Sequence, residues 1–497
     1  MKRILLVLIL CFVVISCAKT SRTGRLTILH TNDMHAQFTP LSATWIKSDV
    51  KPRIGGMVAL DYFIDRARTQ FANALLLDAG DICTGTLLSK IDYNGALNGG
   101  FVEMMNLIGY DAFTIGNHEF DNGQENLHKL VGLADFDVLS ANLLVDGKQF
   151  APKAYKIYRV DGLRVGVIGL VLSNLDHVTA KKNLAGIEVD DPAETAQRLI
   201  DQIDPKTDLI ILLTHQGDDH DVELAENIRN ADIIIGGHSH TRIDTPIVKN
   251  GVIIVQAGSK TRYLGRLTVN VAGDTVSSFD GELIPVWVDS VRNPNPVMKG
   301  LVDNFQSSIE KEYGRQIGVL KTAWRKNNDA ETNLGNYITD VMRETMKVDL
   351  AFINSGGIRK SLPAGPITKV DVMEILPFSN YLVSFKLTGQ QLMQIMANAL
   401  RHNIFGDSGV LQVSGIECRY KVGGGQVTVT SLKVNGEEVQ PAKMYSAATV
   451  DFVLGGMEEY EFQDVVTTPQ LLSDVVIEYI EAHPEVDSSV ESRISKE

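Results

Sequence analysis

The chain has 497 residues, more than one typical domain holds, so two to four domains are expected. Hydrophobic residues make up 44% and charged residues 22%, which is ordinary globular composition and excludes a disordered chain, collagen and a multi-span membrane protein. The net charge of −14 argues against a polymeric nucleic acid as partner. A small anionic substrate would need a local cation, either a metal or a few arginines.

The N-terminus has the pattern of an export signal. Two basic residues precede an apolar run from Ile4 to Ile15, which is too short to span a bilayer. The run leads into Ser16-Cys17, which resembles bacterial lipoprotein signals, where cleavage before the cysteine precedes lipidation of its thiol. We therefore predict a lipoprotein-type signal over residues 1–16. The exported protein would reside in the cell envelope or periplasm, in contact with a membrane only through lipid on Cys17. The alternative is a plain signal peptide that contains a cysteine.

From Leu26 onward, short apolar runs alternate with helical patterns. One helical pattern has apolar residues at Phe101, Met104, Met105 and Ile108. Continuous apolar strands indicate sheets covered on both faces, and polar residues gathered after the strands place a site on the strand-end loops. The predicted strands are Leu26–Leu29, Ala74–Leu77, Ala112–Ile115, Val138–Ser140, Val165–Gly169, Leu209–Leu213, Ile233–Ile235 and Val252–Val255.

The alternating pattern weakens near residue 290. The Asn-Pro-Asn-Pro segment at residues 293–296 indicates a linker, and apolar residues then recur every four positions. These signals predict a layered α/β domain over 26–290, a linker helix over 297–313 and an α+β domain over 319–497. Helices of the second domain are expected near 332–346, 388–402 and 470–482.

The histidines gather in the first half of the chain. Of 11 histidines, all but His402 and His483 lie between residues 30 and 240. A single histidine is usually a surface or core residue, whereas several on successive strand-end loops, together with Asp and Asn, are typical of metal ligands. The donors are nitrogen and oxygen without thiolate, which suits Zn, Mn, Fe or Co.

Four blocks of these polar residues carry a resemblance to a known superfamily. Asp33-x-His35, Gly80-Asp81, the block 116–119 (GNHE) and the block 237–240 (GHSH) resemble the signature of the calcineurin-like metallophosphoesterases. The longer strings 28–33, 116–121 and 354–359 (NSGGIR) are similar to those of the secreted 5′-nucleotidase and UDP-sugar hydrolase family. The similarity extends from Leu26 to Ser495. It implies a four-layer αββα metallophosphoesterase domain, a linker helix and a nucleotide-recognising α+β domain.

The resemblance implies two divalent metal ions. Their ligands would be Asp33, His35, Asp81 and His240 for one ion, and Asp81, Asn117, His215 and His238 for the other. Asp81 would thus bridge the ions, and His118 with Asp121 would form a catalytic dyad. Such a pair of cations activates a hydroxide for attack on phosphorus, while the dyad stabilises charge on the leaving oxygen. The sequence assigns no role to His30, His128, His177 and His220, and Glu119 is expected to cap the local turn.

Residues of the C-terminal half are expected to bind the substrate. The resemblance implies that Asn354, Gly357 and Arg359 contact the nucleotide, with Arg325 as a second phosphate arginine. Glycine lets a backbone approach a ligand closely, and an arginine can hold a phosphate with two parallel hydrogen bonds.

Relatives hold the base between two aromatic rings. Phe452 matches one ring, while the position matched to the other is Val410. We therefore expect loose binding of the base with poor discrimination between bases.

These residues predict a dinuclear-metal hydrolase that releases phosphate from nucleoside 5′-monophosphates. A UDP-sugar pyrophosphatase and a 2′,3′-cyclic-nucleotide phosphodiesterase are alternatives on the same scaffold. A surface lipoprotein that binds nucleotides without turnover is a third hypothesis, disfavoured because every ligand and dyad position is filled. A purely structural envelope protein is disfavoured further.

Overall fold

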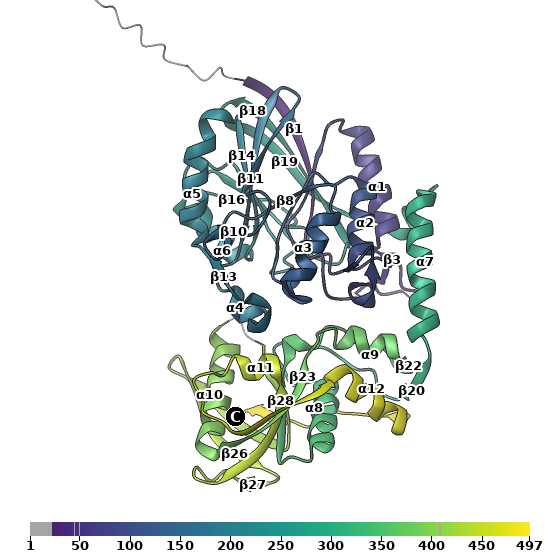
Figure 1. Ribbon diagram of the computed structural model, residues 1–497, viewed down its shortest axis with the longest axis vertical. Helices are drawn as coiled ribbons and strands as arrows, with labels where there is room; N and C mark the ends of the chain where they lie inside the picture. The colour runs from purple at the N-terminus through teal and green to yellow at the C-terminus, as the bar shows by residue number, and fades with distance from the viewer. Residues whose placement is uncertain (1–21, 44, 49, 407–408) are drawn as a thin grey trace, which may run out of the picture.

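A computed structural model describes residues 22–43, 45–48, 50–406 and 409–497. The predicted signal and Cys17 lie outside these residues. Figure 1 shows two domains, the N-terminal one above and the C-terminal one below, with helix α7 (Pro296–Tyr313) along one side between them. Among the described residues, no helix is long and apolar enough to cross a bilayer.

The N-terminal domain contains two six-stranded sheets. The first has the order β19-β18-β1-β4-β7-β8, in which β1, β4, β7 and β8 are parallel. The second has the order β11-β12-β14-β15-β17-β16, with β12, β14, β15 and β17 parallel. The strands of the first sheet are β1 (Arg22–Thr31), β4 (Leu75–Asp78), β7 (Ala112–Thr114), β8 (Asp137–Leu139), β18 (Tyr263–Gly273) and β19 (Thr275–Pro285). Those of the second are β11 (Tyr155–Val160), β12 (Leu163–Val171), β14 (Leu209–His215), β15 (Ile233–Ile235), β16 (Ile247–Lys249) and β17 (Val252–Val255).

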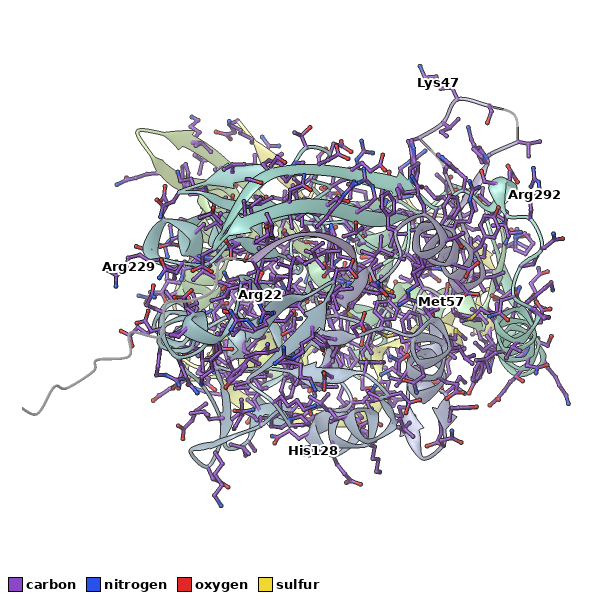
Figure 2. The ribbon with its side chains drawn as sticks, turned by 90° about the horizontal axis from the view of Figure 1, so that it is seen from above. Arg22, Lys47, Met57, His128, Arg229 and Arg292 are labelled. Carbon is purple, nitrogen blue, oxygen red and sulfur yellow. The ribbon has the colours of Figure 1, made fainter. Side chains whose placement is uncertain are left out.

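The two sheets pack face to face, and helices cover their outer faces. Between the sheets, buried side chains such as Ile28, Leu77 and Leu213 form one core, and each contributes roughly 1.5–3 kcal/mol by leaving water. Helices α1 (Met57–Gln70), α2 (Gly99–Ile108) and α3 (Gly123–Leu133) pack on the first sheet, with α7 outside α1 and α2, and α5 (Pro192–Ile203) and α6 (Asp218–Asn227) pack on the second. Seen from above, Met57 at the start of α1 and Arg229 beyond α6 lie on opposite sides of the strands (Figure 2). The predicted four-layer αββα class is confirmed.

The C-terminal domain is built on a five-stranded sheet with the order β24-β21-β28-β23-β29. Thr332 and Thr388 cap its helices α8 and α10, each accepting a hydrogen bond from a backbone amide three residues on. The sheet strands are β21 (Leu350–Asn354), β23 (Tyr381–Thr388), β24 (Leu411–Ser414), β28 (Met444–Val450) and β29 (Gln463–Leu471). Smaller sheets contain β20 (Gln316–Leu320), β22 (Gly365–Thr368) and β30 (Glu485–Val486), and β25 (Ile416–Gly423), β26 (Gln426–Val434), β27 (Glu437–Glu438) and β31 (Ile494–Lys496). The helices are α8 (Asn333–Met346), α9 (Lys369–Ile375), α10 (Gly389–Phe405), α11 (Asp451–Gly455) and α12 (Leu472–Ala482).

Polar contacts join the two domains at the end where the strands of the N-terminal domain finish. Lys182 Nζ lies 2.9 Å from Asp451 Oδ2 at the start of α11, and Lys181 Nζ lies 2.7 Å from Glu458 Oε2. Lys90 Nζ donates to Ser379 Oγ at 3.0 Å. The loops of the C-terminal domain therefore lie against the strand-end loops that carry the histidines.

Candidate dinuclear metal centre

The predicted ligands come together because parallel strands end at one edge of each sheet. In the first sheet, Thr31 of β1 pairs with Asp78 of β4, and Asp78 pairs with Phe113 of β7, so the loops after these strands start side by side. His215 is the last residue of β14, and the loop after the neighbouring strand β15 carries the GHSH block. The two packed sheets thus bring all the predicted ligands to one end of the domain.

The first group of donors consists of Asp33, His35 and His240, whose ligand atoms lie within 4.8 Å of one another. The Nε2 atoms of His35 and His240 are 2.8 Å apart, and Asp33 Oδ1 lies 3.4 Å from His240 Nε2. Two imidazole nitrogens converge with a carboxylate oxygen on a common centre. This arrangement fits a divalent cation.

The second group contains Asp81, His215 and His238, joined by the side chain of Asn117. Asp81 Oδ2 lies 3.2 Å from His215 Nε2, and Asn117 Oδ1 lies 2.9 Å from His238 Nδ1. Asp81 also groups with His35 of the first cluster. The structure therefore places Asp81 between the two donor groups, where a bridging carboxylate would sit.

Backbone carbonyls fix which ring nitrogen of two histidines faces the centre. His35 Nδ1 lies 2.9 Å from the carbonyl oxygen of Thr84, and His215 Nδ1 lies 2.7 Å from that of Ala79. Because a carbonyl accepts only, each Nδ1 carries a proton and each Nε2 is the ring nitrogen that faces the donor groups. Metal-binding histidines are commonly oriented by such contacts.

The backbone at five of the predicted ligands is left-handed, which is rare for residues other than glycine. The φ angles of Asp33, His35, Asp81, His238 and His240 are 49°, 49°, 58°, 80° and 58°. Gly116 allows a further close approach, because a Cβ there would lie 2.4 Å from Asp81 Oδ1. Clustering of such strain at one site is typical of functional loops.

Charge at the centre also fits a cation. Burial alone would raise the pKa of the Asp81 carboxyl, but the nearby imidazoles of His215 and His118 hold it well below its usual range. Burial, with a contribution from His240, lowers the pKa of His35 well below its usual value, so this ring is neutral. A buried ionised carboxylate beside a neutral imidazole is a suitable donor set for a divalent metal.

His118 and Asp121 form the predicted dyad geometry. His118 Nδ1 lies 2.8 Å from Asp121 Oδ2, which also accepts a hydrogen bond of 2.6 Å from Thr84 Oγ1. Burial would lower the pKa of His118, but the carboxylates of Asp121 and Asp81 outweigh it and raise that pKa. Since His118 Nε2 lies 3.9 Å from Asp81 Oδ2, the ring faces the donor groups.

Glu119 does more than cap its own turn. Its buried carboxylate accepts hydrogen bonds from the backbone amides of Gly116, Asp81, Ile82 and Cys83, at 2.7, 3.0, 2.9 and 3.1 Å. It therefore holds the loop that carries Asp81. The sequence did not predict this longer-range role. Its only indication was that Glu119 directly follows a predicted ligand, Asn117, and the dyad residue His118.

The C-terminal domain brings one predicted substrate residue close to the centre. The charge of Arg359 is near enough to Asp81, Asp121 and Asp33 for these carboxylates to affect its pKa, which burial lowers. Asn354 Oδ1 is buried without a hydrogen-bond partner among the described residues, and a Cβ at Gly357 would lie 3.1 Å from it. Arg325, in contrast, is exposed and lines a separate cavity of about 820 Å³ together with Asn336 and Ser488.

Val410, the position matched to the second base-stacking ring, is a buried residue of the C-terminal domain. Val410 is only 4% exposed, its amide donates to the carbonyl of Asn328, and its carbonyl accepts from Ser355.

The aromatic residue that sequence reasoning missed is Phe378. Its ring stacks on His118 at 5.7 Å and 26°, and Arg359 Cζ lies 5.7 Å from the same ring centroid. The amide of Tyr381, three residues on, donates to Asp451 next to Phe452. In the sequence, Phe378 is an isolated aromatic residue after Pro377 and belongs to no recognisable motif.

The four unassigned histidines lie outside the donor groups. His30 is buried, His128 stacks on Phe150 with ring centroids 4.7 Å apart, and His177 and His220 are exposed. These placements agree with the packing and surface roles expected for them.

Two donor groups sharing one carboxylate, with a His–Asp pair beside them, define the class of a metallophosphoesterase. Residues 26–242 match the family model of calcineurin-like phosphoesterases, and residues 313–464 match that of the 5′-nucleotidase C-terminal domain. The chain belongs to the 5′-nucleotidase family, in which these two domains are combined, and is a hydrolase of phosphate esters.

Individual relatives cover nearly all of the chain. It is 30% identical to the protein UshA of Salmonella pullorum, with 94% of this chain and 93% of that protein covered. A 5′-nucleotidase precursor of Thermus thermophilus has a similar structure, with a TM-score of 0.86, 27% identity, and 95% and 99% of the two chains covered. The trifunctional nucleotide phosphoesterase YfkN of Bacillus subtilis is 31% identical over 88% of this chain, which spans only 32% of that longer protein.

Proposed function

We propose that the protein releases inorganic phosphate from nucleoside 5′-monophosphates with two divalent metal ions at the donor groups described above. The observation that carries this proposal is that Phe378 stacks on His118 and also lies 5.7 Å from Arg359 Cζ. A guanidinium for a phosphate and an aromatic face for a base thereby adjoin the donor groups of the other domain. The name of the Thermus relative agrees with this substrate class.

The predicted ligands would hold two metal ions at the phosphate of such a substrate. One metal ion would take Asp33, His35, Asp81 and His240 as ligands, and the other Asp81, Asn117, His215 and His238. When bound, such ions polarise phosphoryl oxygens and lower the pKa of water. Zn, Mn, Co and Fe all suit these nitrogen and oxygen donors.

The remaining residues would orient the substrate and balance charge. Protonated His118, oriented by Asp121, would donate toward the leaving oxygen of the ester. Arg359 would hold the phosphate, and Phe378 and Phe452 would stack on the base. Asn354 Oδ1, which lacks a partner among the described residues, could accept a hydrogen bond from the substrate.

The location of the protein is also part of the proposal. The apolar run from Ile4 to Ile15 and the following Cys17 support export with a lipid anchor at the cell envelope. Mass spectrometry of the mature N-terminus tests this directly, because lipidated Cys17 would be the first residue.

Phosphate release from AMP, measured after chelation and after return of Mn²⁺ or Zn²⁺, tests the proposed activity. A substrate panel that adds UDP-glucose, a 2′,3′-cyclic nucleotide and an aryl phosphate separates it from the related activities. Turnover of AMP that vanishes on chelation supports the proposal. Metal-dependent cleavage of only one of the other substrates would replace it, and nucleotide binding without any turnover would indicate a binding protein.

A further inference from the structure

Gln256, the first residue after strand β17, contacts the loop that carries His238 and His240. Its side chain is buried, with 0% exposure, and has no place among the ligands, the dyad or the substrate contacts described above. A buried amide needs partners for both its oxygen and its nitrogen, so those partners show which segment the side chain holds. The hydrogen bonds that the structure gives to this amide all go to the loop 237–241.

Three hydrogen bonds join the amide of Gln256 to every second residue of this loop. Its Oε1 accepts from the Thr241 backbone amide at 2.5 Å and from Ser239 Oγ at 3.0 Å. Its Nε2 donates to the Gly237 carbonyl oxygen at 3.2 Å. Because a backbone amide only donates and a carbonyl only accepts, these partners determine the orientation of the side-chain amide.

The residues that alternate with these contacts are the predicted ligands His238 and His240. His238 belongs to the donor group that contains Asp81, and His240 belongs to the other group. Both histidines have left-handed backbones, with φ angles of 80° and 58°. Such conformations persist in non-glycine residues only where surrounding contacts enforce them. The bonds to residues 237, 239 and 241 supply such contacts on either side of each histidine.

Other contacts hold the same loop from its outer side. The Gly258 amide donates to the Thr241 carbonyl oxygen at 3.1 Å. At the start of α6, the Asp218 amide donates to Ser239 Oγ at 3.2 Å, and Asp218 Oδ1 accepts from Thr241 Oγ1 at 2.8 Å. Because these bonds do not involve the side chain of Gln256, the loop is expected to stay folded when that side chain is changed.

We propose that Gln256 is a positioning residue for both metal ions, because it holds the loop from which His238 and His240 reach different donor groups. This inference rests on the proposed function, since it concerns the two metal ions of that proposal. Ligands that are held in place before an ion arrives bind it more tightly, because less order is lost on binding. Loss of the Gln256 amide should therefore weaken the binding of both ions.

The test is the metal affinity of the full chain, measured by competition between the metal-free protein and a chromophoric chelator for Zn²⁺. Gln256→Met keeps an unbranched side chain of similar size but removes the three hydrogen bonds. It should weaken binding of both zinc ions about 10–100-fold, as changes to residues that orient metal ligands commonly do. Ser239→Ala, at an exposed position, removes one of the three bonds and should weaken binding about two- to tenfold.

Gln412 provides a matched control in the C-terminal domain. Its side chain is 1% exposed and holds the start of α8 with the same kinds of bond. Its Oε1 accepts from the Thr332 amide at 2.9 Å, and its Nε2 donates to the Ala330 carbonyl oxygen at 3.0 Å. Gln412→Met should lower resistance to urea, as Gln256→Met does, because both remove buried hydrogen bonds. It should leave both zinc affinities unchanged.

Unchanged zinc affinities in Gln256→Met, with folding verified by circular dichroism, would overturn the inference, and so would weakening of only one of the two ions. If Gln256→Met does not fold, Ser239→Ala decides by the same criterion. Phosphate release from AMP by the wild-type chain tests the proposed function separately. Two zinc ions bound without that release, together with weaker binding in Gln256→Met, would refute the nucleotidase assignment and leave the role of Gln256 standing.

Discussion

The carboxylate of Glu119 accepts a hydrogen bond from the backbone amide of Asp81 at 3.0 Å. This bond joins two loops that are distant in sequence and orients the residue that would bridge the metal ions. Burial, followed by the charge of Asp81, raises the pKa of Glu119 to about 7. Four amide donors on one carboxylate offset this penalty and hold the loop in place.

Glu119→Gln should weaken metal binding at the centre about 10–100-fold, because one carboxylate oxygen becomes an amide group that faces backbone N–H donors. Metal content after dialysis against a weak chelator measures this effect. Glu125→Gln, an exposed change in helix α3, serves as the control. Equal metal retention in the two variants would show that Glu119 does not support the centre.

His118→Ala should keep the metal ions but lower kcat for AMP about 10²–10⁴-fold, because the protonated imidazole acts on the leaving oxygen and is not a ligand. An aryl phosphate, whose leaving group needs no proton, should lose less. Steady-state kinetics on both substrates, with metal content measured in parallel, decide the point. An unchanged kcat for AMP would remove His118 from the mechanism.

Phe452→Ala should raise KM for AMP by about one to two powers of ten, because stacking on one aromatic ring contributes roughly 1–3 kcal/mol per base. KM for an aryl phosphate should change less, since it has no base to stack. Phe378→Ala should lower kcat as well, because Phe378 also packs on His118. If Phe452→Ala leaves KM for AMP unaltered, α11 does not contact the base.

Asp208→Asn should destabilise the N-terminal domain by about 2–3 kcal/mol at neutral pH, since Asp208 accepts hydrogen bonds from Arg164 Nε and Nη2 at 3.0 and 2.7 Å. Burial would raise the pKa of Asp208, but these bonds outweigh it and lower that pKa. The stabilisation is therefore complete above the unfolded-state pKa of about 3.9 and is lost as pH falls through the lower folded-state value.

Urea unfolding of both proteins at pH 7 and at pH 3 measures this dependence. The difference in free energy of unfolding between wild type and Asp208→Asn should shrink at the lower pH. Glu188→Gln, on the exposed side of a short strand, should show no such difference. If the difference in free energy of unfolding between wild type and Asp208→Asn is the same at both pH values, the ion pair does not contribute as described.

The sequence was sufficient for features encoded in short stretches. Apolar runs located the strands that carry the ligands, and blocks such as Asn117-His118 revealed both the family and the αββα class, which are confirmed. A linker helix predicted over 297–313 corresponds to α7 at Pro296–Tyr313. Local signals work here because strand and helix periods and ligand spacings are themselves local.

Contacts between segments that are distant in the sequence could not be predicted from local patterns. The contact of Glu119 with the Asp81 loop joins segments that only the packed fold brings together. Phe378 was missed for the same reason, because an isolated aromatic in a loop has no period to identify it. Val410 was matched to the base-stacking position along the chain, and the sequence alone did not indicate that it is buried in its own domain.

The central claim is a pair of metal ions that share the carboxylate of Asp81. Its most direct measurement is the metal content per chain of wild type and Asp81→Ala after gel filtration, with circular dichroism to verify folding. The account predicts two equivalents in wild type and loss of both in the variant, because the bridging charge also offsets repulsion between the ions. Two equivalents of metal retained by folded Asp81→Ala would contradict it.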